Sequence, residues 1–215
     1  MQIRPIPHPD LPLVDHRFSD LLGQDSWMRL PAAVRRRFGK RVRGGASVAY
    51  QGVVTRMHMN WAGWALAQVT RLSGAPLPYD MSCAGKPAVV IVTEDIAGNG
   101  QFWIRQYGRA SGFPQVIHSS KRFAGATGIE EYVGYGIGMA LRVVEENGAL
   151  LFKSEHYFLS VVGKRIRIPS PIAPGDLVIG HHDLGAGRFR FSMRLKHALL
   201  GNVLSQDAEF EDPKE

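Results

Sequence analysis

Several polar side chains stand in the apolar, strand-like second half of the chain, where they are candidates for chemistry. They are Arg105, His118, Glu131, Glu155, His156 and His197. A histidine beside a carboxylate can transfer protons as a general acid or base, and either glutamate could supply that carboxylate. In an apolar cup, the same polar groups would form the floor of a small-molecule site. The residue types therefore fit either acid–base catalysis or ligand binding.

Alternation along the expected strands gives each candidate a face, because neighbouring strand residues point to opposite sides. Arg105 shares a face with Trp103 and Tyr107, His118 with Val116 and Ser120, and His156 with Phe152, Ser154 and Phe158. If Arg105, His118 and His156 point into one interior, they form its polar floor. The alternative is that they lie on the wet face, or are core polar groups with partners. The full candidate set for ligand binding is Trp103, Arg105, His118, Glu131, His156, Tyr157 and His197.

Metal, cofactor and thiol chemistry have weaker support. His181 and His182 are adjacent on an expected strand, so their side chains point apart and cannot easily bind one ion. No metal site and no cofactor are predicted. Cys83 is the single cysteine, which excludes an intrachain disulfide and makes a reducing cytoplasm the default expectation. A catalytic role for this thiol has no adjacent signature to support it.

The elements that must position these residues are mostly strands. From Pro87 onward the apolar pattern has a period of two, and Gly-Asn-Gly at 98–100 and Asn-Gly at 147–148 predict hairpin turns. Before it, Leu30–Phe38 and Asn60–Ser73 are expected to be helices, with Pro31 and Asn60 at their starts. We interpret Trp61 and Trp64 of the second helix as packing against the sheet rather than as an aromatic binding platform.

Two strands indicate the shape of the sheet. Residues 188–196 alternate strictly, with Phe189, Phe191, Met193 and Leu195 facing inward and the basic residues facing water. In the strand expected from Tyr135 to Glu145, glycines gather on one face, which favours sharp bending or a close approach. The fold class is therefore mainly β: a strongly curved antiparallel sheet or closed calycin-like barrel with two N-terminal helices. An α+β sheet gripping a helix is the alternative. Residues 1–25 are expected to be an extended arm and residues 26–212 a single β-rich domain.

The chain carries a net charge of +7 and a pI of about 9.8, which permits a polyanionic partner without establishing one. Basic residues cluster between Arg35 and Arg43, but no aromatic residues interleave them, so a solvated helix end is favoured over a nucleic acid site. No apolar run reaches the ~18 residues of a spanning helix, and we expect no signal peptide in the proline-broken N-terminal segment. We therefore expect a cytoplasmic protein with no membrane span. The oligomeric state stays open.

A set of short motifs resembles one bacterial family. The set includes 134–139 (Gly-Tyr-Gly-Ile-Gly-Met), 167–169 (Arg-Ile-Pro), 181–191, and His197 with 198–201 (Ala-Leu-Leu-Gly). Upstream, 50–52 (Tyr-Gln-Gly) and 74–78 (Gly-Ala-Pro-Leu-Pro) also fit. Their order is similar to that of the domain-of-unknown-function family 4166 over most of residues 30–211, except that the family has proline at Ala198. The resemblance implies no established activity, although some members look appended to saccharopine-dehydrogenase-like proteins.

Three hypotheses of function follow. The first is binding of a small apolar or lipid-like ligand inside the barrel or sheet. The second is a hydrolase or isomerase that uses Arg105, His118 and either Glu131 or His156. The third, drawn from the resemblance, is an interaction module for a nicotinamide-dependent oxidoreductase. Whether the protein is an enzyme is left open by the sequence.

Overall fold

A computed structural model describes residues 14–74 and 76–213 of the chain. Its helices are α1 (Arg17–Leu22), α2 (Gln24–Arg29), α3 (Ala32–Phe38) and α4 (Trp61–Thr70), with short 3₁₀ turns at Arg71–Ser73, Met81–Cys83 and Ser170–Ile172. Its strands are β1 (Ser47–Met59), β2 (Pro87–Asp95), β3 (Gly100–Tyr107), β4 (Gln115–Arg122), β5 (Glu130–Gly134), β6 (Ile137–Glu146), β7 (Ala149–Val161), β8 (Lys164–Arg167), β9 (Asp176–Gly185), β10 (Arg188–His197) and β11 (Gly201–Glu211).

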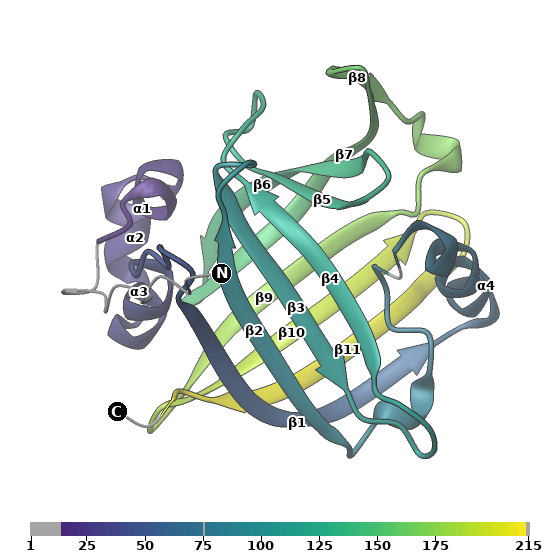
Figure 1. Ribbon diagram of the computed structural model, residues 1–215, viewed down its shortest axis with the longest axis horizontal. Coiled ribbons are helices and arrows are strands. Elements are labelled where there is room, and N and C mark those ends of the chain that lie inside the picture. Colours follow the sequence, from purple (N-terminus) through teal and green to yellow (C-terminus); the bar gives the residue numbers. More distant parts are fainter. Residues whose placement is uncertain (1–13, 75, 214–215) are drawn as a thin grey trace, which may run out of the picture.

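The strands form one antiparallel sheet that closes on itself (Figure 1). Their order is β6-β5-β4-β3-β2-β1-β11-β10-β9-β7-β8, and an additional pairing of β6 with β7 completes the ring. Within the described residues the barrel therefore has ten strands, and β8 extends it by pairing with the end of β7. The mainly β, closed-barrel alternative is confirmed over the open sheet that grips a helix, because closure leaves no edge strands in the ring.

Side chains alternate between the barrel interior and its surface as the pattern of β10 predicts. Phe189, Phe191, Met193 and Leu195 are buried at 1–3% exposure, and they pair across β11 with Phe210, Ala208, Gln206 and Leu204. The basic residues Arg188 and Lys196 at either side of this run are exposed, and Arg190 and Arg194 within it are half-buried. Burial of apolar stripes such as this one stabilises the curled sheet, at roughly 25 cal/mol per Å² of apolar surface.

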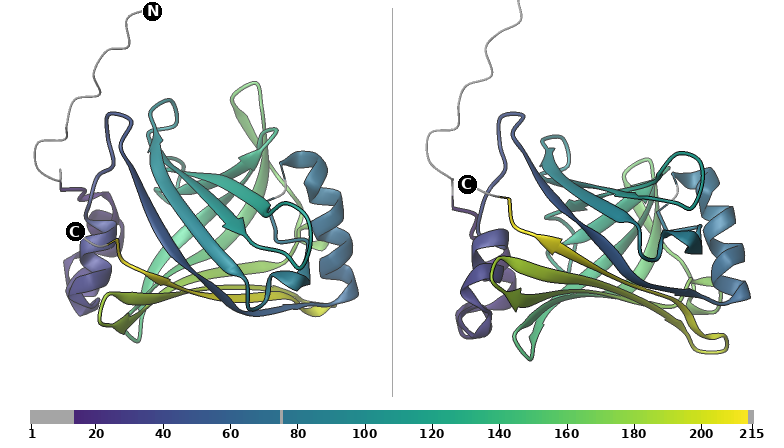
Figure 2. Two further views of the ribbon diagram at one scale, coloured as in Figure 1. Left: turned by 60° about the horizontal axis from the view of Figure 1, so that its bottom comes forward. Right: turned by 90° about the horizontal axis from the view of Figure 1, so that it is seen from below.

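The helices α1–α3 close one end of the barrel (Figures 1 and 2). Phe18 and Phe38 meet edge to face with ring centroids 5.1 Å apart, and Phe38 also contacts Trp103 on the barrel wall. The sequence predicted an extended arm over residues 1–25, and residues 1–13 of it lie outside the described part of the chain. Within the described part, Arg17–Leu22 form a helix instead, because Phe18 anchors this segment in the core at 0% exposure.

Helix α4 stands at the opposite end of the barrel (Figure 2). The expected packing of its tryptophans was wrong, since Trp61 and Trp64 are 76% and 55% exposed. The helix instead buries its small residues Ala62, Gly63 and Ala67. A Cβ atom at Gly63 would lie 2.2 Å from the carbonyl oxygen of Val203, so only glycine allows this approach to β11.

The glycine-rich segment forms a turn and then a strand. Gly134, Tyr135 and Gly136 have φ values of +120°, +48° and +78°, so they turn the chain between β5 and β6. Tyr135 is consequently exposed, and the expected strand begins two residues later than predicted. Gly138 is inside β6, where a Cβ would lie 2.7 Å from the Phe158 ring. Close approach of a side chain is therefore the reason for this glycine.

Candidate functional site

A cavity of about 90 Å³ lies between α4 and the barrel interior, and we call it the α4-side cavity. Its apolar lining includes Leu66 from α4, Leu77 from the following loop, and Ile137, Met139, Ile179 and Leu195 from the strands. On a scale where one water needs ~10–15 Å³, this space holds several water-sized groups. It therefore has room for a short molecule, or for one end of a slender one.

Charged groups enter this cavity from β3 and β5, and a serine on β4 lies between them. Arg105, Ser119 and Glu131 line it and are 2–5% exposed. The Ser119 hydroxyl donates to Glu131 Oε1 over 2.6 Å and accepts from Arg105 Nη1 over 3.2 Å. Lys121 Nζ lies 3.0 Å from Glu131 Oε2. The two residues are close because they stand directly opposite each other on the paired strands β4 and β5. We call Arg105, Ser119, Lys121 and Glu131 the central cluster.

The electrostatics of the central cluster are those of a buried network. Burial favours the neutral form of Glu131, but Lys121, Arg105 and the Ser119 hydroxyl stabilise its charge and hold its pKa below the usual range. Burial lowers the pKa of Lys121, and the neighbouring carboxylate opposes that shift. Arg105 Nη2 is 3.7 Å from Glu131 Oε1, which is too long for a hydrogen bond. Neither this nitrogen nor Arg105 Nε has a hydrogen-bond partner among the described residues.

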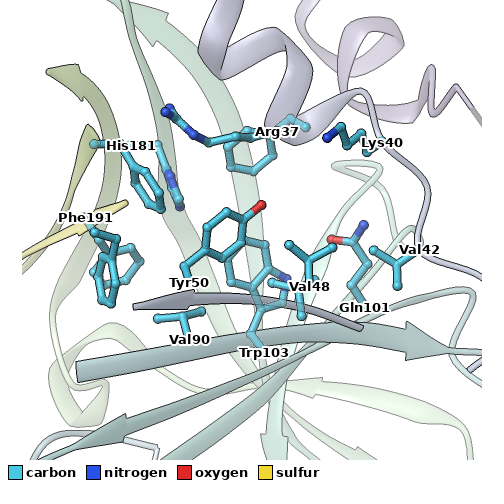
Figure 3. A pocket seen from close by; sticks show the side chains of 14 residues that line it. Arg37, Lys40, Val42, Val48, Tyr50, Val90, Gln101, Trp103, His181 and Phe191 are labelled. Carbon is cyan, nitrogen blue, oxygen red and sulfur yellow. The ribbon is translucent and has the colours of Figure 1, made fainter. Parts of the chain in front are cut away.

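A second, smaller pocket lies toward α3, and we call it the aromatic chamber (Figure 3). Its volume is about 30 Å³, so it has room for little more than water. Tyr50, Trp103, His181 and Phe191 line it, and Arg37 of α3 lies beside it. Arg37 pairs with Asp212, which links α3 to the residue that follows β11. The α4-side cavity is thus the larger of the two interior pockets.

Four of the seven predicted ligand-binding residues line the interior. Arg105 and Glu131 belong to the central cluster, and Trp103 lines the aromatic chamber. Tyr157 lines the α4-side cavity, and its hydroxyl donates to the carbonyl of Gly175 over 2.8 Å. Burial raises the pKa of this phenol, so it stays a hydrogen-bond donor.

The three predicted histidines do not join them, because each points away from the interior. His118 is on the exposed face of β4, where Ile117 and Ser119 point inward, and it lies beside Gly74. A bulge in β7 leaves Glu155 without a partner in β6, just before His156. As a result Tyr157 points inward and His156 points outward. His197 is at the turn between β10 and β11, where its Nδ1 accepts from the amide of Leu199. The convergence that the hydrolase or isomerase hypothesis requires is therefore not found.

Sequence reasoning missed Ser119, Lys121 and His181. Arg105 pairs with Ile117, so Ile117, Ser119 and Lys121 share the inner face of β4. The alternation of the strand would therefore have predicted Ser119 and Lys121 once its inner face was known. His181 is 5% exposed and packs against Phe38, Phe189 and Phe191, whereas His182 points outward to Ser192. Burial, with Arg37 nearby, lowers the pKa of His181 well below its usual value, so this imidazole is neutral.

Other chemistry finds little support in the described part of the chain. No group there has three or more histidine, cysteine, aspartate or glutamate side chains placed to hold a metal ion. Cys83 is fully buried, and burial together with Asp80 raises its pKa to about 11, which keeps the thiol protonated. None of the described helices is long and apolar enough to cross a membrane.

The fold and this interior define the class: a closed antiparallel β-barrel that encloses an apolar cavity with a charged floor. Comparison with protein families matches residues 30–210 to the domain of unknown function DUF4166. The chain belongs to this family, as its motifs indicated. Searches of curated proteins and of solved structures found no significant match.

Proposed function

We propose that the protein binds a small, slender apolar or lipid-like molecule in the α4-side cavity. The observation that carries the proposal is the cavity itself, which is lined mainly by apolar side chains from α4 and several strands. Well-packed interiors leave few spaces larger than a water molecule, so a cavity of about 90 Å³ at the end of a barrel is a feature that needs an explanation. Apolar pockets with a few convergent polar groups are the usual form of small-molecule sites.

The position of α4 supports the same proposal. This short helix contacts β1 and β11 through small residues, while Leu66 reaches over the cavity. Residues Pro76 and Leu77 from the loop and Pro174 from the far side complete this end of the lining. An entrance covered by a helix and loops, rather than by paired strands, can open without breaking the barrel, because local opening costs least where few backbone ladders are involved.

A titration followed by methyl NMR tests the proposal. Decanol, added below its solubility limit, should shift the methyl signals of Leu66, Ile137 and Ile179 saturably. The Ile137→Trp variant fills the cavity and should abolish these shifts. Ile166→Trp is the matched control, because Ile166 is 56% exposed on β8 and does not line the cavity. Equal binding by both variants, or no saturable shift in the wild-type protein, would overturn the proposal.

A further inference from the structure

The central cluster contains more positive than negative charge. Arg105 and Lys121 are both cationic, and Glu131 is the single carboxylate within 4.0 Å of either among the residues that the structure describes. All three side chains are 4% exposed or less. A buried charge without a counter-charge is costly, and proteins normally offset it by pairing. The cluster as it stands lacks one negative charge.

The excess charge belongs mainly to Arg105. Lys121 has a close partner in Glu131 Oε2 at 3.0 Å, and its ammonium also lies over the rings of Trp103 and Phe152. Arg105 also lies over aromatic rings, those of Trp103 and Phe191, and donates from Nη1 to Ser119. Its Nε and Nη2, however, have no hydrogen-bond partner in the described structure. These nitrogens are on one edge of the guanidinium, which is the edge that binds a carboxylate with two parallel hydrogen bonds.

We infer that the ligand of the α4-side cavity is a carboxylic acid with an apolar chain, and that its carboxylate binds Arg105. This inference rests on the proposed function, since it assigns a head group to the same ligand. A single carboxylate makes the charge of the cluster zero, whereas a phosphate monoester, with nearly two charges, would overcompensate it and crowd Glu131. The aliphatic side chains between α4 and Arg105 then surround the chain of the acid.

Matched ligands separate the head group from the chain. Isothermal titration at neutral pH should show that decanoate binds at least tenfold more tightly than decanol, and more tightly than decyl phosphate. Equal affinity for decanoate and decanol would overturn the carboxylate assignment and leave the proposed function intact. Tighter binding of decyl phosphate would also overturn it, in favour of a dianionic head. Binding of none of the three would overturn both proposals.

A variant then locates the carboxylate. Arg105→Met removes the excess charge and leaves the Lys121–Glu131 pair balanced, so the interior stays neutral. It should lower the affinity for decanoate at least tenfold and change that for decanol less than threefold. Equal loss for both ligands would contradict a contact between Arg105 and the carboxylate.

A measurement on the wild-type protein does not depend on the folding of any variant. The carbon signal of carboxyl-labelled decanoate reports its pKa in the bound state. Contact with Arg105 should lower that pKa below the value of free decanoate in the same buffer. An unchanged or raised pKa would overturn the inference, since it would place the carboxyl group away from the arginine.

Discussion

Arg105 and Glu131 face each other inside the barrel without a hydrogen bond, with Nη2 and Oε1 separated by 3.7 Å and the Ser119 hydroxyl bridging the two side chains. The carboxylate thus lies between two cations, because Lys121 approaches its other oxygen. This arrangement places Glu131 between the two basic side chains and leaves Nε and Nη2 of Arg105 without hydrogen-bond partners in the described structure.

Glu131→Gln should destabilise the protein strongly, because it leaves Arg105 and Lys121 buried together without a counter-charge. Loss of one partner of a buried ion pair costs about 3–5 kcal/mol of unfolding free energy. Urea denaturation measures the change. Glu155→Gln is the control, because it breaks the exposed Glu155–Arg142 pair and should cost about 1 kcal/mol or less. Similar costs for the two variants would contradict the central role of Glu131.

Acid should weaken the fold through His181. The folded pKa of this histidine lies well below the ordinary 6.5, so an unfolded chain binds a proton that the folded chain does not. Its contribution to stability is therefore complete above pH 6.5 and falls as the pH drops toward the folded pKa, by up to about 1.4 kcal/mol per pH unit.

Urea midpoints measured at a series of pH values below 6.5 test this prediction. The His181→Leu variant should lose most of the dependence of the unfolding free energy on pH in this range. His182 should leave a smaller residual slope, since partial burial and Arg190 lower its pKa as well. A slope that is identical in the His181→Leu variant would show that another group governs this range of pH.

Gly63→Ala should displace α4 from β11, because the added Cβ would lie 2.2 Å from the Val203 carbonyl oxygen. Overpacking of this kind costs about 1–3 kcal/mol, and chemical denaturation would record it. Val69→Ala, on the exposed side of the same helix, is the control and should change stability by roughly 0.5 kcal/mol or less. If the alanine at position 63 has no effect, the helix does not pack as described.

Trp61→Ala and Trp64→Ala should each change the unfolding free energy by roughly 0.5 kcal/mol or less, because both rings are mostly exposed. A tryptophan in a core would instead cost about 3–5 kcal/mol on truncation. Thermal or urea unfolding distinguishes the two cases. A loss in the larger range would restore the interpretation that these rings pack on the sheet.

The features that the sequence predicted correctly are those whose pattern lies within a single strand or turn. The inner face of β10 and the hairpin at Asn147–Gly148 followed from local alternation and turn chemistry. The tryptophans of α4 were misassigned because ring size indicated burial, while the helix packs through Gly63, whose importance depends on the distant Val203 carbonyl. Such an approach cannot be inferred from a helix pattern alone.

The same limit explains the candidate site. Arg105 and Glu131 do lie in the interior. The hypothesis also turned His156 inward, because nothing in the local pattern marks the bulge at Glu155. The hypothesis that turned His118 inward also turned Ser119 outward, since only one of two adjacent strand residues can face inward. Which face of β4 is the inner one depends on its pairing with β3, a non-local fact.

Intermolecular NOEs between bound decanoate and the labelled methyl groups of the protein test the central claim, that the α4-side cavity is the binding site. The account predicts NOEs from the chain to Leu66, Ile179 and Leu195, which line the cavity. NOEs confined to exposed methyl groups such as those of Leu72 and Leu199, or none under saturating conditions, would contradict it.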